Sequence, residues 1–496
     1  MNNLFPVALQ TLAVALIASS LLTPVTALAD NAASAGGVTF VSKGLVAVGR
    51  IPSNQRDKFG ETFGSGSGMS IDTSSWSKDG AGYRGKLWLL PDRGYNVVGT
   101  TDYRERLNTI AIELMPTAAG AVPAAGAEQT GLKANLADTL ILTDDKGTDT
   151  TGLDPLNGTR APSGDMPLLP QTENGKVSLD AEAISRMPDG TFFISDEYGP
   201  YIYRFAADGK MMSATQPPAA LLPMRKGTVN FASNNPGPGA SAPDPKDPDT
   251  GRQNNQGLEG LSLTPSGKHL IAVLQSATRQ DGGDSGSTRD NTRALVFDAA
   301  DPAHLKLVHE YVVPLPTFKD AAGKKKVAAQ SEIVALSDTT FLMLARDSGN
   351  GSGLKDATSV YRVVNVVDLS GATDIAGTNF DKDKPVAPKG KLDASVKPAT
   401  ITPLIDINDK AELGRFGLHN GEPNDRNNLS EKWEAMSLAS VLDPNRPDDY
   451  FLFVANDNDF LTQDGFQVGA AYKAEDGADV DTTFLVYEVT LPGLKK

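Results

Sequence analysis

Residues 180–205 read Asp180-Ala-Glu-Ala-Ile-Ser-Arg-Met-Pro-Asp-Gly-Thr-Phe-Phe-Ile-Ser-Asp-Glu-Tyr-Gly-Pro-Tyr-Ile-Tyr-Arg-Phe205. Three short β-rich runs follow one another here, and a Pro-Asp-Gly sequence separates the first run from the second. Such runs, bounded by Pro, Asp and Gly, predict antiparallel strands joined by tight turns. The unit begins at Glu182, reverses direction at the turn and returns to Asp196 and Glu197.

This unit recurs along the chain. Full copies begin at Glu259, Glu332 and Glu434, and a degenerate copy begins at Gly68, where the glutamate is missing. A further strand follows each copy, so a unit holds at least three strands. Antiparallel units repeated in this way are typical of the blades of a β-propeller, whereas a β-sandwich does not predict a recurring unit. We therefore predict an all-β fold, a β-propeller.

The number of blades is less sharply determined. Five units are visible, and the segment from Val38 to Val48 could complete a sixth with other strands and close the ring. Six blades are the preferred count, and five or seven remain open. Low-complexity stretches at residues 116–129, 213–257 and 371–400 are interpreted as long surface insertions, because the repeat resumes after each of them.

The N-terminus has the features of an export signal. An apolar run from about Leu4 to Leu22 leads to Ala27-Leu28-Ala29, a pattern typical of signal-peptidase sites. We predict that residues 1–29 are a signal peptide and that residues 30–496 form one propeller domain, periplasmic or secreted. An uncleaved anchor is the alternative, because the run approaches membrane-spanning length. No second run of comparable length follows, so we expect no stable membrane insertion after cleavage.

Composition excludes several classes of function. The chain has no cysteine, which excludes disulfides, thiolate metal sites and a cysteine nucleophile. Its net charge of -15 disfavours nucleic acid as a partner, because phosphate backbones are bound mainly by clustered Lys and Arg. No histidine has the context of a serine triad, and no protein partner is indicated.

The repeat brings its carboxylates to one side. In each unit the first strand begins at a glutamate and the second ends at an acidic or amide residue, so both points lie opposite the turn. In a ring, one mouth would then collect Asp92, Glu182, Asp196, Glu197, Glu259, Glu332, Asp347, Glu434 and Asp457.

Crowded carboxylates need compensation. Two like charges ~4 Å apart repel by about 4 kcal/mol at an effective dielectric near 20. We therefore predict a divalent cation among Glu182, Asp196, Glu197, Glu259, Glu332, Asp347, Glu434 and Asp457. Ca²⁺ is preferred, and Mg²⁺ or Mn²⁺ also suits oxygen ligands. Any single glutamate could instead accept backbone N–H groups within its own blade, and that alternative stays open.

Three arginines stand next to these strand ends. Arg93 follows Asp92, Arg346 precedes Asp347, and Arg279 lies four residues after Gln275. Guanidinium groups bind anions in a fork geometry, so the three are candidates for binding a small anionic substrate. Ion pairs with the neighbouring carboxylates are the alternative.

Residues 180–205 resemble the signature of the family described as esterase-like activity of phytase. Residues 90–94, 255–262 and 432–437 agree with it, and the resemblance covers nearly all of the mature chain. It implies an exported propeller whose recurrent acids carry phosphoester hydrolysis. By motif, the family's acids correspond to Glu182, Asp196, Glu197, Glu259, Glu332, Asp347 and Glu434. Gly68 and Gln275 depart from the pattern and leave one sector of the ring less acidic.

These observations favour a metal-dependent hydrolase of phosphorylated small molecules. Glu182, Glu434 and Asp196 are its candidate catalytic residues, and the metal would activate water. A propeller lactonase or carboxylesterase with one buried divalent ion is a second candidate. A non-catalytic binding or scaffold propeller is a third, because fold does not determine function.

Overall fold

The computed structural model describes residue 1, residues 31–64 and residues 66–494. Apart from Met1, the predicted signal peptide and its cleavage point after Ala29 lie outside the described residues. Among the described residues, no helix has the length and apolar character needed to cross a bilayer.

The described chain is built from five antiparallel sheets that form the blades of a propeller, as predicted. The first blade consists of β3 (Gly68–Ile71), β5 (Gly82–Leu90), β6 (Arg106–Leu114) and β7 (Leu132–Ile141), with β4 (Ser77–Asp79) beside β5. The second consists of β10 (Ala181–Arg186), β11 (Phe192–Asp196), β12 (Ile202–Phe205) and β13 (Met211–Thr215). The third consists of β16 (Leu258–Leu263), β17 (His269–Leu274), β18 (Asn291–Asp298) and β19 (Lys306–Pro314). The fourth consists of β22 (Ala329–Ala335), β23 (Thr340–Arg346), β24 (Arg362–Asp368) and β25 (Thr400–Asp406).

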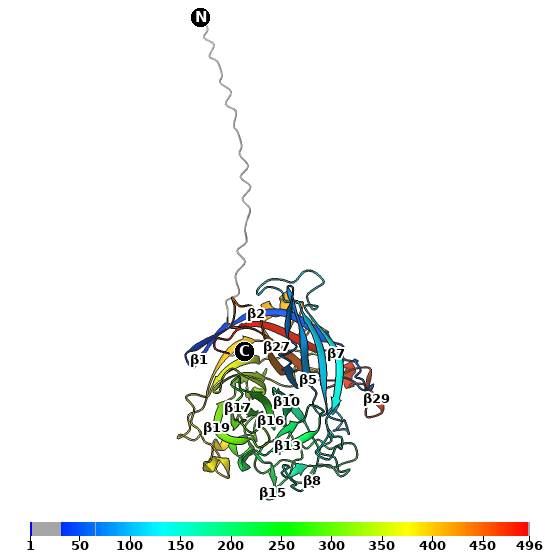
Figure 1. Cartoon of the computed structure of the whole chain (residues 1–496), viewed down its shortest axis with the longest axis vertical. Coiled ribbons are helices and arrows are strands. Elements are labelled where there is room, and N and C mark those ends of the chain that lie inside the picture. Colours follow the sequence, from blue (N-terminus) through cyan, green and yellow to red (C-terminus); the bar gives the residue numbers. More distant parts are fainter. Residues whose placement is uncertain (2–30, 65, 495–496) are drawn as a thin grey trace.

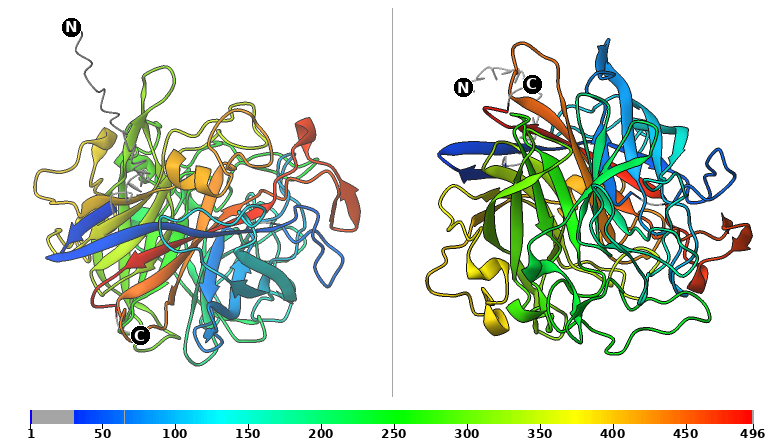
Figure 2. Two further views of the ribbon diagram at one scale, coloured as in Figure 1. Left: turned by 90° about the horizontal axis from the view of Figure 1, so that it is seen from above. Right: turned by 60° about the horizontal axis from the view of Figure 1, so that its bottom comes forward.

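The fifth blade joins the two ends of the chain. Its strands are β26 (Lys432–Ser440), β27 (Asp449–Asp457), β30 (Thr482–Thr490), β2 (Val38–Ile51) and β1 (Asn31–Ala35). In Figures 1 and 2 the blue β2 runs alongside the red β30, and their register extends from the pair Val41 and Thr490 to the pair Ile51 and Thr482.

This pairing decides the blade count. The first strands of the blades contact one another in the order β3, β10, β16, β22 and β26, and β26 returns to β3. The ring therefore closes at five blades rather than at the preferred six. The segment Val38 to Val48, which we expected to help build a sixth blade, supplies an outer strand of the fifth.

Apolar clusters fill the spaces between neighbouring blades. Trp433, Leu452 and Leu485 of the fifth blade pack with Leu344 and Val364 of the fourth, and all five side chains are buried. Strands buried on both faces need apolar residues at successive positions, which is why β17, β23 and β27 read as nearly continuous apolar runs.

The serine of the repeat joins neighbouring blades. The Oγ atom of Ser185 accepts a hydrogen bond from the backbone N–H of Leu263 at 2.9 Å, and that of Ser262 accepts from Ala335 at 2.9 Å. Ser437 accepts from Ile71 at 3.0 Å, which joins the last blade to the first. The serine in the repeat therefore serves the fold, because it satisfies backbone donors between the inner strands.

The insertions pack on the outside of the blades. Ile375, Phe380 and Val386 of the 371–400 insertion form an apolar cluster with Val312 of β19. The remaining strands form short hairpins: β8 (Thr159–Arg160) with β9 (Leu169–Pro170), β14 (Met224–Arg225) with β15 (Thr228–Val229), β20 (Thr317–Lys319) with β21 (Lys325–Val327), and β28 (Gly465–Gln467) with β29 (Ala470–Tyr472). In the described chain, the one α-helix is α1 (Lys410–Arg415); the 3₁₀ turns are η1 (Ala219–Leu221), η2 (Arg279–Asp281), η3 (Asn379–Asp381), η4 (Pro388–Gly390) and η5 (Glu475–Gly477).

Candidate functional site

The inner strands of the ring begin at one mouth. Lys432 at the start of β26 pairs with Asp457 at the end of β27, and Ala181 pairs with Asp196 in the second blade. The starts of the first strands therefore lie beside the ends of the second strands, as the hairpin argument predicts. The turns lie at the opposite end, where Pro188 and Pro265 help line a cavity of about 810 Å³.

A β-bulge sits at the start of three inner strands where the glutamate occurs. In β16, Leu258 and Gly260 pair with adjacent residues of β17, so Glu259 is the extra residue. Glu434 is the extra residue in β26 in the same way, and the register of β10 is irregular between Ala181 and Ile184, around Glu182. A bulge re-aims a side chain and ends regular pairing, which frees these glutamates from the alternation of the strand.

The fourth blade differs by one residue. In β22 the irregularity falls between Gln330 and Glu332, so Ser331 is the extra residue and Glu332 pairs with Leu344. The Oε1 atom of Glu332 accepts backbone N–H bonds from Ile333 at 2.8 Å and Leu261 at 3.4 Å. Glu332 also lines the cavity at the turn end of the ring. Its hydrogen bonds match the structural alternative that the repeat left open.

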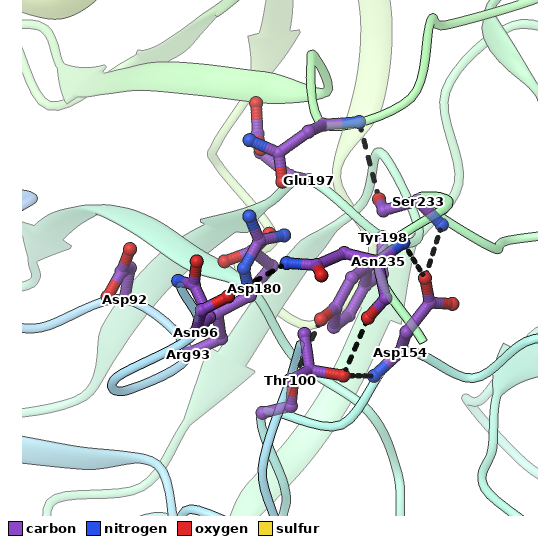
Figure 3. A network of polar contacts seen from close by, with 12 residues as sticks. Asp92, Arg93, Asn96, Thr100, Asp154, Asp180, Glu197, Tyr198, Ser233 and Asn235 are labelled. Atoms are coloured by element: carbon purple, nitrogen blue, oxygen red, sulfur yellow. Dashed lines mark hydrogen bonds and ion pairs between the residues drawn. The ribbon is translucent and has the colours of Figure 1, made fainter. Parts of the chain in front are cut away.

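Three acids of the second blade form what we call the blade-two trio, Asp180, Glu182 and Glu197. One carboxylate oxygen of each lies within 4.8 Å of the others, and all three residues are buried. Arg93 donates to Oδ2 of Asp180, while Oδ1 of Asp180 is buried without a hydrogen-bond partner. Figure 3 shows Arg93 beside Asp180, with Glu197 on the far side from the loop that carries Arg93.

A second group of acids surrounds Lys432, and we call it the lysine cluster. The carboxylates of Asp92, Asp457 and Asp459 also lie within 4.8 Å of one another. The Nζ atom of Lys432 is 2.5 Å from Asp457, 3.0 Å from Asp459 and 3.5 Å from both Asp92 and Glu434. An ammonium group therefore lies where a cation would bind, and this cluster is already partly neutralised.

Two further glutamates complete the mouth. Arg346 donates to Oε1 of Glu434, and Gln275 donates from Nε2 to Oε1 of Glu259 at 2.8 Å. Both glutamates are buried. Gln275, the residue that departed from the acidic pattern, thus supplies an amide in place of a fifth strand-end carboxylate.

The electrostatics of the mouth are unbalanced. Burial, together with Glu259 and Glu197, holds the pKa of Glu182 well above its usual range. Burial likewise raises the pKa of Glu197 and of Glu434 to about 7, whereas Lys432 lowers the pKa of Asp457 against the opposing effect of burial. Eight carboxyl groups meet here against the three cations that contact them, Arg93, Arg346 and Lys432. The surplus must bind protons or a cation.

Other predicted site residues lie outside these clusters. Asp196 accepts backbone N–H bonds on both oxygens, from Asp180 at 2.6 Å and Gly199 at 2.8 Å. Asp347 accepts from Ser359 Oγ and the N–H of Val360, both at 2.6 Å. These two aspartates brace the ends of their strands.

Arg279 also turns away from the mouth. It belongs to η2, and its Nε atom donates to the carbonyl of Pro248 at 3.2 Å. The three arginines predicted to bind substrate therefore divide into Arg93 and Arg346, which pair with acids of the mouth, and Arg279, which does not.

Asp180, Asp459 and Lys432 were missed by the repeat argument. Each lies two residues from a residue that the argument found: Glu182, Asp457 and Glu434, respectively. Asp180 precedes β10 and Asp459 follows β27, so strand alternation could not have identified them. The signal that the sequence offered was a second charged residue close to each strand end at the mouth.

The loop that carries Arg93 is held in place by Asp154. The Oδ2 atom of Asp154 accepts N–H bonds from Ser233 at 3.1 Å and Asn235 at 2.9 Å, and its own N–H donates to Thr100 Oγ1 at 2.9 Å. Figure 3 shows these contacts linking the loop after Asp92 to the insertion between the second and third blades. Arg93 is therefore presented to Asp180 by a braced segment.

Comparison with known proteins identifies the class. The model of the Phytase-like family, described as esterase-like activity of phytase, matches residues 62–460. The chain is thus a β-propeller that belongs to this family, as the resemblance in residues 180–205 indicated.

Individual relatives add context. A protein of Arthroderma benhamiae described as an uncharacterized secreted protein is 39% identical over 460 residues, which cover 87% of this chain and 89% of the relative. Among solved structures, a luciferin-regenerating enzyme aligns over 91% of this chain and 97% of its own, at 9% identity and a TM-score of 0.30. A putative 6-phosphogluconolactonase from Bacteroides uniformis aligns over 84% and 88%, at 11% identity and a TM-score of 0.27. These scores are too low to transfer a fold or an activity.

Proposed function

We propose that the chain is an exported, metal-dependent phosphoester hydrolase whose metal binds at the blade-two trio. This proposal rests on Asp180, Glu182 and Glu197. Their carboxylate oxygens converge, and among the described residues Arg93 is the one cation that pairs with them. The family description supports ester hydrolysis as the class of activity. The secreted relative supports export.

The residues of the trio fit a divalent cation. They offer hard carboxylate oxygens, and Oδ1 of Asp180 is buried without a hydrogen-bond partner. Their pKa values are raised chiefly by burial, so a cation that displaces protons from Glu182 and Glu197 would relieve the repulsion between them. The lysine cluster fits a second metal less well because Lys432 already lies among its carboxylates.

The roles of the side chains follow from their surroundings. A divalent ion at the trio would supply Lewis-acid polarisation of a phosphoryl oxygen and of water. Without metal, burial raises the pKa of Glu197 to about 7, so Glu197 would give up its proton on binding the cation and serve as a ligand. Glu434 has a similar pKa of about 7 and is bound by Arg346, so it can hold or release a proton on the opposite side of the mouth.

A substrate panel tests the proposal. The mature protein is assayed with p-nitrophenyl phosphate, bis-p-nitrophenyl phosphate, phytate and p-nitrophenyl acetate, with Ca²⁺ and with EDTA. We expect turnover of phosphoesters that EDTA abolishes. Turnover of the acetate alone would move the assignment to the carboxylesterase or lactonase class. Inactivity on all four substrates in folded, metal-loaded protein would favour a binding propeller.

Paired variants locate the chemistry. Glu182→Gln should lower kcat by ~100-fold or more while the protein stays folded, because a metal ligand is lost from the trio. Glu332→Gln is the matched control, since it changes the same motif residue in a blade where the carboxylate binds backbone N–H groups. Equal losses in the two variants would contradict a site at the trio.

A further inference from the structure

One arginine at the mouth end of the third blade has no side-chain hydrogen bond or ion pair within the part of the chain that the structure describes. Arg289 lies between η2 and β18, is half-buried, and its Nε atom is buried without a hydrogen-bond partner. Across the described ranges 31–64 and 66–494, its guanidinium makes no hydrogen bond or ion pair. The adjacent acid, Asp290, is already paired with Lys325 at 2.8 Å. A partly buried guanidinium without a partner is unusual, because the desolvation of its charge is not offset by a hydrogen bond or an ion pair.

The backbone fixes where Arg289 lies. Its carbonyl accepts the N–H of Ala277 at 3.2 Å, two residues beyond Gln275, which binds Glu259 in the mouth. The following carbonyl, of Asp290, accepts the N–H of Leu315 at 2.7 Å. Arg289 is thus held at the mouth end of the third blade between the second and third strands. Nearby charge includes Arg346 of the fourth blade, which together with burial lowers the pKa of Arg289.

This part of the mouth is also its least acidic sector. The third blade ends its second strand in Gln275 rather than a carboxylate, and Glu332 of the fourth blade is directed to backbone N–H groups. Six of the eight mouth carboxylates belong to the blade-two trio and the lysine cluster, and the other two, Glu259 and Glu434, are bound by Gln275 and Arg346. The candidate cation site and the two arginines therefore belong to different blades, the trio to the second and Arg289 and Arg346 to the third and fourth.

We propose that Arg289, with Arg346, forms an oxyanion subsite that binds the phosphate group of a substrate. The inference rests on the proposed function, because the subsite would hold the phosphate group of a substrate that is hydrolysed at the blade-two trio. Arg346 is partly neutralised by Glu434, so Arg289 supplies the uncompensated charge. A guanidinium presents two parallel N–H donors to a phosphate oxygen pair, a geometry that carboxylates cannot provide.

Binding of inorganic phosphate tests the subsite without requiring turnover. Titration calorimetry is performed on the full mature chain with saturating Ca²⁺ and again with EDTA. We expect wild-type protein to bind phosphate and Arg289→Gln to bind it at least about tenfold more weakly, with Arg289→Lys in between. Arg279→Gln is the control, because this arginine of the same segment donates to the carbonyl of Pro248 and should leave phosphate affinity unchanged.

The outcomes separate the two proposals. Phosphate affinity that is the same in Arg289→Gln and wild type, or no phosphate binding by wild type, would overturn the subsite even if esters are hydrolysed. Phosphate binding that depends on Arg289, in a protein that hydrolyses none of the four esters, would keep the subsite and reject the hydrolase. If phosphate affinity falls as much in Arg279→Gln as in Arg289→Gln, the loss of positive charge alone explains the result, and the subsite is rejected.

Discussion

Replacing Lys432 with methionine should create a metal site. Methionine keeps an unbranched apolar stem but removes the ammonium that lies 2.5–3.5 Å from Asp457, Asp459, Asp92 and Glu434. Removing one partner of a buried ion pair leaves uncompensated charge and destabilises a protein by ~3–5 kcal/mol. We therefore expect Lys432→Met to be less stable than wild type in the absence of metal.

The size of the effect on melting follows from the length of the domain. Unfolding entropy is ~2.1 cal/mol/K per residue, so a domain of this length has about 1 kcal/mol/K and should lose ~3–5 °C in Tm. A divalent cation at 100 times its Kd restores about 2.7 kcal/mol, or ~3 °C. Calorimetry with and without Ca²⁺ measures both shifts, and elemental analysis should find one more bound ion per chain than in wild type.

The matched control is Lys43→Met. Lys43 also bridges two acids of the fifth blade, Asp449 at 2.5 Å and Glu488 at 3.1 Å, but Arg446 lies near the same pair. This variant should lose stability without gaining a metal ion. The reasoning is refuted if Lys432→Met binds no more Ca²⁺ than wild type, or if Ca²⁺ raises the Tm of both variants equally.

Three other outcomes are expected. Glu310→Gln should flatten the pH dependence of the free energy of unfolding. Burial raises the pKa of Glu310 to about 8 in the folded protein, so the protonated carboxyl stabilises the fold fully below pH ~4.5. This stabilisation is lost as the pH rises to 8, by at most ~1.4 kcal/mol per pH unit. Urea unfolding at pH 5 and pH 8.5 checks this, and an unchanged slope in the variant would contradict it. Gly68→Ala should destabilise the ring by ~1–3 kcal/mol, because the new Cβ would overlap the carbonyl of Glu182, and calorimetry should show a lower Tm. Gly80→Ala is the comparison for backbone strain alone, because Gly80 has a positive φ but a Cβ there would meet open space. Export should remove residues 1–29, and N-terminal sequencing should then begin at Asp30; an intact Met1 on membrane-bound material would disprove cleavage.

Sequence reasoning reached the fold because the propeller signal is local. Glu259, the Pro-Ser-Gly turn and Gln275 all lie within one hairpin, and a hairpin requires no information from distant parts of the chain. The blade count was different. The count depends on the pairing of β2 with β30, which are more than 400 residues apart in the sequence. A strand that completes the blade of another segment has the same sequence pattern as a strand that begins a new blade.

The site was found only in part because register cannot be read from a motif. Glu259 and Glu332 begin copies of one repeat, yet the bulge falls on Glu259 in β16 and on Ser331 in β22. A shift of one residue changes the face to which a strand residue projects. The repeat therefore predicts that acids gather at one mouth of the ring, but it does not predict which acid binds backbone N–H groups instead of joining the others.

Gly68 lies at a close approach between the first and second blades. A Cβ there would overlap the carbonyl oxygen of Glu182 and lie 2.9 Å from Cα of Ala183. The bulge that frees Glu182 from the regular alternation of β10 thus occupies the space that a side chain of the first blade would need. Gly68 pairs with Leu90, two residues before Asp92, just as Gly260 and Ala435 pair two residues before Gln275 and Asp457. In the first blade the position of the glutamate is therefore occupied by Ser67, whose Oγ atom donates to Asp457 at 3.3 Å.

Repulsion between neighbouring acids also explains why the mouth is unevenly rather than uniformly acidic. A ring with a carboxylate from every blade would need several cations, because neighbouring acids repel and burial raises their pKa values. Here Lys432 neutralises one cluster, Gln275 replaces one acid, and Glu332 is directed to backbone donors. What remains is the blade-two trio with Arg93 as its paired cation, and Arg346 and Arg289 at the mouth ends of the fourth and third blades. A single divalent cation and one bound oxyanion would together balance that arrangement, which is why metal binding and phosphate binding should each strengthen the other.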